Sequence, residues 1–528
     1  MDLAILSATI FTGNPAAPLA QALAVKDGRI ALVGSDDEVR AALTPRTTVL
    51  ELPGRLVTAG LTDAHAHFLG FGQGLSRVDL AGLPSWEACR EKIRKAAEGM
   101  EPGRWIIGRG WNHHKWERAV EPTRRDLDDI TPDNPVMMVR ACGHNLVANS
   151  LALKIAGIDR NTQEPPGGKI DRDPATGEPL GLIREARHLI QKHIPPIGAE
   201  ERRRAALFAQ EKALALGLTG IHSVEGLAEM EAFMALEAEG LLKMRIYHLL
   251  PVEELEEARD RGIVAGGGTS RLWQGHAKLF SDGSLGAATA LLHEPYEGMG
   301  DNCGIPFLEP ALLEEKTALA FSLGWNIAVH AIGDRAVTNT LDAIEGARRK
   351  GPGPRMDRIE HIQLIKERDI ERLRRLSIVG SVQPAFVATD FKVAESLWGR
   401  ERCGRGYPWR TLLDAGIPLQ FGSDSPVEPI DPMLGIQAAV TRQTPAGAPE
   451  GGWFPGQRLT LEETLRGYTL QPAVTSGRDH DLGTLAPGKC ADITVFGKDL
   501  FRVPPERWQE VPVEMTLVSG EILYRMGG

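Results

Sequence analysis

Cysteine is scarce in this chain of 528 residues, and its five cysteines form no CxxC pair. So sparse and odd a set of thiols does not predict a disulfide framework, and a reducing compartment, the cytoplasm, is expected. Long apolar runs are missing too, since no stretch of about 18 consecutive apolar residues could span a bilayer. The first residues, MDLAILSATIFTG, carry an acid where a signal peptide needs a basic segment, and they are typical of a strand.

Positive charge is also in short supply. The formal net charge is −10, which argues against nucleic acid as a partner because phosphate contacts need clustered Lys and Arg. Apolar residues make up 42% and charged residues 25%, as in ordinary globular proteins, and the length allows more than one domain. We therefore expect neither nucleic acid nor a membrane as a partner.

Both ends of the chain are rich in short strands. The first sixty or so residues contain LAILSATIFTG, ALAVKDGRIALVG and TTVLELPGRLVTAG, in which KDGR is a typical hairpin turn. GTLAPGKCADITVFGKDL and VEMTLVSGEILYRMGG near the C-terminus have the same character. Neither end shows a helical period. We therefore expect residues 1–58 and 478–528 to form one composite β-sandwich domain.

The middle of the chain alternates between amphipathic helical stretches and continuous apolar stretches from about residue 199 onward. Seven strands follow there, from LTGIHSV to IPLQFGSDSP, and GRLVTAGLTDAHAH supplies one strand before them. Alternation of this kind indicates a parallel sheet covered by helices. Eight β/α units predict an α/β fold, a closed (β/α)8 TIM barrel over residues 59–477.

A long insertion separates the first two predicted strands, over residues 68–198. It is rich in Trp, Pro and Gly and includes EPPGGKIDRDPATGEPLG. A segment of this length is too long for a plain loop, so we expect a subdomain with its own structure that covers the active site.

Polar residues recur at the C-terminal ends of the predicted strands, where a barrel carries its active site. His65 and His67 lie two apart on the first strand and can face the same side. An isolated HxH is weak support for a metal site, but the full set is of the kind that binds zinc and related divalent ions: His65, His67, Lys278, His330, His361 and Asp424.

These residues, on strands one, four, five, six and eight, resemble the ligand set of the amidohydrolase superfamily. HAKLFSDGSLGAATA, VHAIGDRAV, RIEHIQLI, GSDSPVEPIDPMLGI and RGYTLQPA are similar to the amidohydrolase 3 group, the YtcJ-like proteins. The insertion stretch PTRRDLDDITPDNPVMMVRACGHNLVANSLAL is similar to that group as well.

The resemblance implies one or two divalent ions, in most members zinc. By carry-over, His65, His67 and Asp424 would hold the first ion, and His330 and His361 the second. Lys278 would bridge the ions as an N6-carboxylated lysine, because a free ammonium has no lone pair for a metal. The alternative is an ordinary cation paired with an acid, either Asp282 or Asp334.

The resemblance further implies a small-molecule substrate and hydrolysis of a carbon–nitrogen bond other than a peptide bond, in an amide, N-acyl or N-formyl compound. Metal-bound hydroxide would attack, with Asp424 as the general base. The alternative for Asp424 is a helix N-cap, a role that suits Asp431 better because Pro432 follows it. Two other functions stay open: a deaminase or cyclic amide or ester hydrolase, and a catalytically silent regulatory relative.

Three further residues are candidates for substrate binding. His144 could reach the substrate from the insertion or serve a structural role, and His222 at the second strand could line the pocket or pack. Trp111 could form an apolar wall, although packing within the insertion is the alternative reading for it. A homodimer is the assembly common for such barrels.

Overall fold

The computed structural model describes residues 1–75, 77–141, 144–165, 168–351 and 356–527. They form two compact units, residues 1–71 with 206–528 and residues 72–205. Residues 142–143 and 166–167, within the insertion stretches quoted above, lie outside the described part. The four described cysteines are free thiols. None of the helices in the described ranges has the length and apolar composition that crossing a membrane requires.

The larger unit contains one parallel sheet of eight strands in the order β21-β20-β19-β18-β17-β16-β15-β8. Hydrogen bonds from Asp424 N to His65 O (2.7 Å) and from His67 N to Ser425 O (2.8 Å) join its first and last strands, which confirms the predicted closed barrel. The strands are β8 (Leu61–Ala66), β15 (Leu218–Val224), β16 (Arg245–Pro251), β17 (Leu272–Phe280), β18 (Asn326–Ala331), β19 (Arg358–His361), β20 (Val379–Val382) and β21 (Leu419–Phe421).

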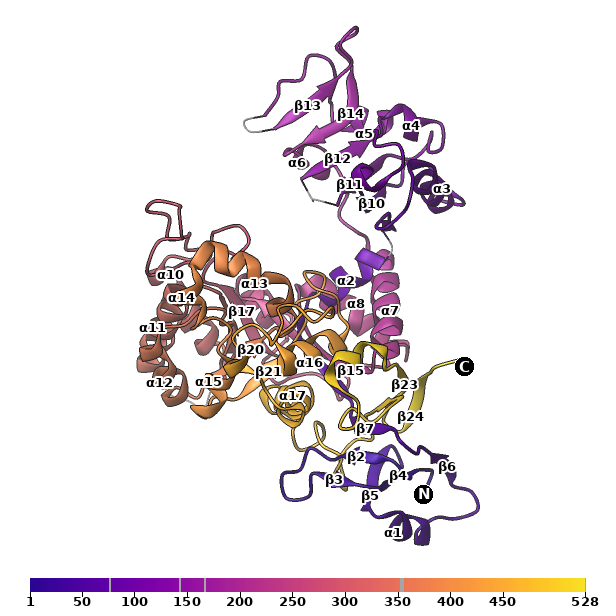
Figure 1. Cartoon of the computed structure of the whole chain (residues 1–528), viewed down its shortest axis with the longest axis vertical. Coiled ribbons are helices and arrows are strands. Elements are labelled where there is room, and N and C mark those ends of the chain that lie inside the picture. Colours follow the sequence, from indigo (N-terminus) through magenta and orange to yellow (C-terminus); the bar gives the residue numbers. More distant parts are fainter. Residues whose placement is uncertain (76, 142–143, 166–167, 352–355, 528) are drawn as a thin grey trace. The chain divides into compact units, whose positions relative to one another are not determined.

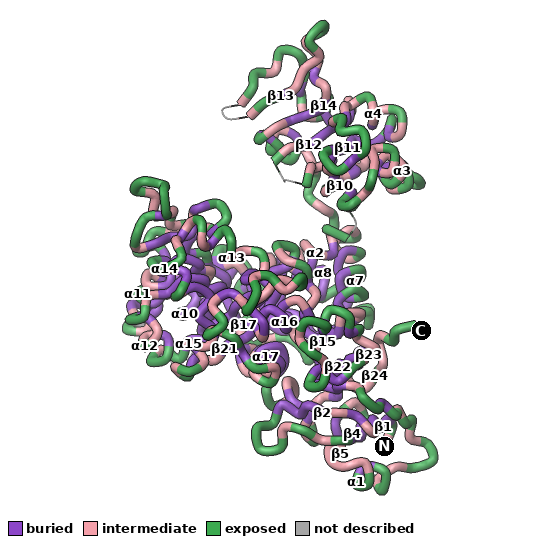
Figure 2. The backbone as a smooth tube through the Cα atoms, viewed as in Figure 1, coloured by how far each residue is buried: buried purple, intermediate pink, exposed green. Residues whose placement is uncertain are grey.

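Helices alternate with these strands and lie around the outside of β17, β20 and β21 (Figure 1). All seven residues of β15 are buried, as a strand covered on both sides requires, and buried residues concentrate in the barrel (Figure 2). The helices are α7 (Ala199–Ala215), α8 (Leu227–Ala238), α9 (Leu255–Asp260), α10 (Pro310–Ser322), α11 (Asp334–Lys350), α12 (Glu367–Arg375), α13 (Ala385–Trp398), α14 (Arg400–Cys403), α15 (Trp409–Asp414), α16 (Pro432–Thr441), α17 (Leu461–Tyr468) and α18 (Leu470–Thr475).

Strands from both ends of the chain share one β-sandwich, as expected. A six-stranded sheet has the order β24-β23-β22-β7-β2-β3, and a four-stranded sheet has the order β5-β4-β1-β6. In Figure 1 the indigo N-terminal strands lie beside the yellow C-terminal strands. The strands are β1 (Leu3–Leu6), β2 (Thr9–Phe11), β3 (Leu19–Ala20), β4 (Ala22–Lys26), β5 (Arg29–Gly34), β6 (Thr48–Glu51), β7 (Leu56–Ala59), β22 (Ile493–Phe496), β23 (Val513–Val518) and β24 (Glu521–Arg525).

Local sequence explains the details of this sandwich. The predicted KDGR turn joins β4 to β5, with Asp27 and Gly28 at φ +50° and +73°, as a type I′ turn requires. A short helix, α1 (Asp36–Ala41), follows β5 although neither end of the chain shows a helical period. Its six residues are too few to display a period. The signal is instead the capping box of Ser35 and Glu38, in which each side chain bonds the other's backbone N–H.

The smaller unit is built on a mixed six-stranded sheet in the order β13-β14-β12-β11-β10-β9, which confirms that the insertion carries its own structure. One apolar cluster packs on each face of this sheet, with α3 on one side and α5 and α6 on the other. The elements are β9 (Val78–Asp79), α3 (Trp86–Ala97), β10 (Ile106–Trp111), α4 (Arg125–Asp128), β11 (Val136–Arg140), β12 (Asn145–Ala148), α5 (Ser150–Ile155), β13 (Lys169–Arg172), β14 (Pro179–Arg184) and α6 (His188–Gln191). The covering role expected of this insertion stays a prediction.

Candidate metal centre

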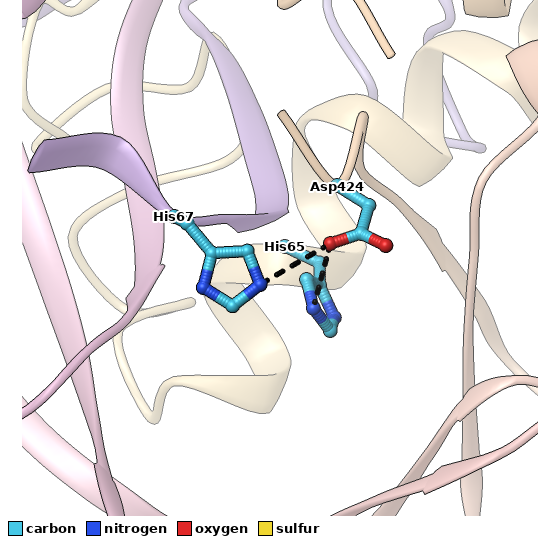
Figure 3. A group of neighbouring side chains, drawn as sticks. All are labelled: His65, His67 and Asp424. Atoms are coloured by element: carbon cyan, nitrogen blue, oxygen red, sulfur yellow. Dashed lines mark ion pairs between the residues drawn. The ribbon is translucent and has the colours of Figure 1, made fainter. Parts of the chain in front are cut away.

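Three of the predicted ligands meet where the first and last barrel strands join. His65 and His67 lie on and just after β8, and Asp424 follows β21. Oδ1 of Asp424 lies 3.4 Å from Nε2 of His65 and 3.4 Å from Nε2 of His67. Figure 3 shows this oxygen pointing between the two imidazole rings. One ligand atom from each of the three residues lies within 4.8 Å of the others, a spacing that suits a single metal ion.

The histidines predicted at the ends of β18 and β19 join the same cluster. The ring centroids of His330 and His361 are 4.5 Å apart, and those of His361 and His65 are 5.2 Å apart. Neighbouring strands bring them together, since Ala331 pairs with His361 in the register of β18 and β19. The structure therefore gathers all four predicted histidines at one end of the barrel.

One ring nitrogen of each histidine is held by an oxygen acceptor. Nδ1 of His65 lies 2.6 Å from Oε2 of Glu360, and Nδ1 of His67 lies 2.8 Å from the carbonyl oxygen of Val224. The other two histidines donate to Gly283 O (2.9 Å, from Nε2 of His330) and Gln383 Oε1 (2.7 Å, from Nδ1 of His361). Because each acceptor holds the N–H of one ring nitrogen, the other nitrogen carries the lone pair whenever the ring is neutral, as in metal-binding histidines. The residues present fit a divalent metal.

Burial keeps most of these rings neutral. It lowers the pKa of His330 to about 4, with the charge of Lys278 adding to the effect, and it lowers the pKa of His361 well below its usual range. For His67, the pKa-lowering effect of burial is outweighed by its bond to Asp424, so its pKa is raised. Burial also raises the pKa of Asp424, but the charges of His65 and His67 outweigh it and hold this pKa well below its usual range. Asp424 is therefore ionised and can act as a ligand.

Lys278 on β17 points into the same region. Its side chain is buried, and within the described residues Nζ meets no hydrogen-bond partner. Burial lowers the pKa of Lys278 to about 8. The alternative pairing with Asp282 or Asp334 is not formed. Asp282 accepts backbone N–H groups of Leu291, Ile332 and Gly333, and Asp334 lies 3.5 Å from Nζ of Lys366. An unpaired buried amine of this kind fits the carboxylated bridging role.

Two of the predicted ligands have an unusual backbone conformation. His361 has φ +78° and Asp424 has φ +58°, both in the left-handed region that residues other than glycine rarely adopt. Such strain collects at functional sites. The turn at His361 explains how His361 joins the cluster although the preceding residue, Glu360, also faces the barrel interior.

Asp63 lies next to the junction between β8 and the loop that follows β21. Its Oδ1 accepts from the backbone N–H groups of His65 (3.1 Å) and Ser423 (3.0 Å), and its Oδ2 accepts from Oγ of Ser423 at 2.5 Å. It therefore fixes β8 to the loop that carries Asp424. The N-cap role considered for Asp424 falls to Asp431, whose side chain accepts from Met433 N at the start of α16.

The residues that orient the histidines were not predicted from the sequence. Glu360 and Arg358 are fully buried, and Glu360 Oε1 lies 2.6 Å from Arg358 Nε while its other oxygen faces His65. Burial raises the pKa of Glu360, but the charge of Arg358 outweighs it, so the pKa lies well below its usual range. The signal was the alternation in RIEH, which places two charged residues on the inner side of a strand.

Of the three candidates for substrate binding, His222 belongs to the larger unit, and Trp111 and His144 belong to the smaller one. His222 is buried inside the barrel, where Arg358 Nη1 donates to its Nδ1 at 2.9 Å. Trp111 is completely buried in the core of the smaller unit and donates from Nε1 to Met138 O, the contacts of a ring that packs within the insertion. His144, also in that unit, is exposed, and its Nδ1 lies 2.9 Å from Oε2 of Glu185. Substrate binding by His144, His222 or Trp111 stays a prediction.

Residues 48–524 match the amidohydrolase family. The chain is 34% identical to a putative amidohydrolase, YtcJ, of Bacillus subtilis (strain 168), over 96% of both chains. It is 30% identical to an N-substituted formamide deformylase of Arthrobacter pascens, over 100% of this chain and 99% of the other. An uncharacterised metal-dependent hydrolase from Pyrococcus furiosus superposes with a TM-score of 0.79 at 31% identity, covering 94% of this chain and 99% of that one.

Proposed function

Because the chain belongs to the amidohydrolase family, a family of hydrolases acting on carbon–nitrogen bonds, we propose that it cleaves an amide, N-acyl or N-formyl compound other than a peptide. The observation that carries this proposal is the cluster of four histidines, each with one ring nitrogen tied to an acceptor, around the ionised Asp424. The similarity to a deformylase of N-substituted formamides supports the N-formyl class in particular.

We propose that His65, His67 and Asp424 hold one divalent ion, zinc by preference, and that His330 and His361 hold a second. Lys278, carboxylated on Nζ, would join the two. A divalent ion there would lower the pKa of a bound water toward neutrality and polarise the substrate carbonyl.

Asp424 would also act as the general base. Its carboxylate would accept a proton from the attacking water and pass this proton to the nitrogen of the leaving amine. The C–N bond breaks as the new C–O bond forms, so one water converts the amide to a carboxylic acid, or formic acid for a formamide, and an amine. The oxygen that faces the two histidines would serve as the ligand, which leaves Oδ2 to carry the proton.

A panel of N-formyl and N-acyl amines, assayed with zinc-loaded and chelator-treated protein, tests this function. We expect hydrolysis of at least one member by the loaded protein and its loss after chelation. Asp424→Asn should abolish turnover while metal analysis still finds bound zinc, and the exposed Asp414→Asn in α15 serves as the control. Turnover that survives chelation, or full turnover by Asp424→Asn, would contradict the proposal.

A further inference from the structure

The smaller unit contains a pocket of its own, with a volume of about 460 Å³. It lies on the face of the sheet that carries α6, and its floor is formed by Ile107 of β10, Met137 and Val139 of β11, and Ile194. Residues two apart on a strand share a face, which is why Met137 and Val139 both line it. This volume lies within the range of sites for small organic ligands.

Four arginines surround this apolar floor. Arg109 extends from β10, two residues after Ile107, and Arg140 ends β11. Arg77 and Arg187 complete the set from the segments before β9 and α6. Among the residues described, the lining includes no Asp or Glu. The pocket therefore combines an apolar floor with surrounding side chains whose charges are all positive.

Some other arginines of this unit are paired with carboxylates. Arg184 donates to both Glu121 and Asp171, and Arg104 lies 3.4 Å from Glu201. In the described part of the unit, by contrast, Arg77 and Arg109 have no carboxylate within ion-pair distance.

The nearest acid in the strand register makes no ion pair with Arg109. Asp79 pairs with Arg109 across β9 and β10, but its Oδ1 accepts from the backbone N–H of Ala81. Burial, together with the like charge of Arg109, lowers the pKa of Arg77. These two cations therefore face each other's charge without the compensation that the other ion pairs of the unit provide.

We propose that this pocket binds a small amphiphilic anion, with its carboxylate or phosphate group held by Arg77 and Arg109 and its apolar body on the floor residues. Arginine presents a planar fork of donors that matches both anions. An apolar body of several carbons would cover Ile107, Met137 and Val139, which explains why the site is not a simple basic patch. This site lies within residues 72–205 and does not depend on which amide the barrel hydrolyses.

Calorimetric titration of the full chain with octanoate and with octyl phosphate tests the site and tells the two headgroups apart. The titrations are run with zinc-loaded and with chelator-treated protein, so that a carboxylate bound at the barrel metals is recognised by its loss on chelation. We expect saturable binding of at least one of the two anions in both forms, and weaker binding of acetate and of octan-1-ol.

Variants then locate the site. Arg109→Gln and Arg77→Gln should each weaken binding about tenfold or more, since each removes a charged hydrogen-bond donor. Arg160→Gln removes an exposed arginine of the same unit that lies outside the pocket and should leave binding unchanged. Circular dichroism confirms that each variant folds. A dissociation constant weaker than about 1 mM for both anions, or equal affinity in Arg109→Gln, would overturn the proposal.

Discussion

Oε2 of Glu360 lies 2.6 Å from Nδ1 of His65, and neither side chain is more than 1% exposed. The contact fixes the tautomer of a histidine whose other nitrogen faces Asp424. Arg358, on the same strand, balances the charge of Glu360. A buried ion pair inside the barrel therefore sets the orientation of a predicted metal ligand.

Glu360→Gln should weaken zinc binding by about 10- to 100-fold, the usual effect of losing a partner that orients a ligand. Competition with a fluorescent chelator measures the affinity at a temperature where circular dichroism shows folded protein. Glu371→Gln, on the exposed side of α12, is the control. Unchanged zinc affinity in Glu360→Gln would mean that this contact serves packing alone.

Lys278→Ala should lower the bound metal per chain, because the bridging group is removed. Formate or propionate should restore part of the metal and of the activity, since a free carboxylate can occupy the position of the carbamate. Metal analysis with and without these acids provides the measurement, and Lys212→Ala, exposed on α7, is the control. If Lys278→Ala retains the metal content of the parent protein, Lys278 is not a bridge.

Stability should fall in mild acid because buried histidines stay neutral in the fold. Burial lowers the pKa of His276 to about 3, with Arg358 adding to the effect, and burial lowers the pKa of His248 to about 4. An unfolded histidine titrates near pH 6.5, so below that pH the unfolded chain binds protons that the folded chain does not. Each group then costs about 1.4 kcal/mol per pH unit until its folded pKa is reached.

Thermal unfolding of chelator-treated protein at several pH values between 7.5 and 5 reports this loss. His276→Gln should flatten the dependence of the midpoint on pH, whereas His480→Gln, which changes an exposed ring, should not. A midpoint that does not move with pH in the parent protein would contradict the expectation.

The barrel and the β-sandwich are joined by a second buried ion pair. Arg245 of β16 bonds Asp492 through Nε and through Nη2, the latter at 2.9 Å from Oδ1, and both residues are buried. Asp492→Ala should lower the free energy of unfolding by about 3–5 kcal/mol, because it leaves a buried guanidinium unpaired. Denaturant unfolding measures the change. Combining Asp492→Ala with Arg245→Met should recover part of it, and no recovery would show that the pair matters chiefly through its packing.

The barrel was readable from the sequence because its strands are continuous apolar runs separated by amphipathic helices. The same regularity located His330 and His361, since a strand end in a barrel has one predictable position. Two features of the site could not be predicted from the alternation of helices and strands. The left-handed backbone at His361 and Asp424 is set by tertiary contacts, and the pairing of Glu360 with His65 joins residues that are 295 positions apart.

The individual strands of the insertion could not be predicted from the sequence for a different reason. Its strands belong to a mixed sheet with a layer on each face, so apolar residues of one strand divide between two clusters. Met138 packs with Trp111 on one side, while Met137 packs on the other. From sequence alone a fully buried tryptophan and one that lines a ligand site look alike, and only the register of β10 with β11 separates them.

The pairing of β7 with β22 determines when the β-sandwich can fold during synthesis of the chain. Val57 lies opposite Val495 in that ladder. Strand β7 therefore lacks one of its two neighbouring strands, β22, until the ribosome has synthesised almost the whole chain. The nascent N-terminal strands must therefore wait, with one edge open, while the barrel is synthesised. Joining strands so distant in sequence favours slow completion of the fold, and it gives chaperones a defined edge to protect during translation.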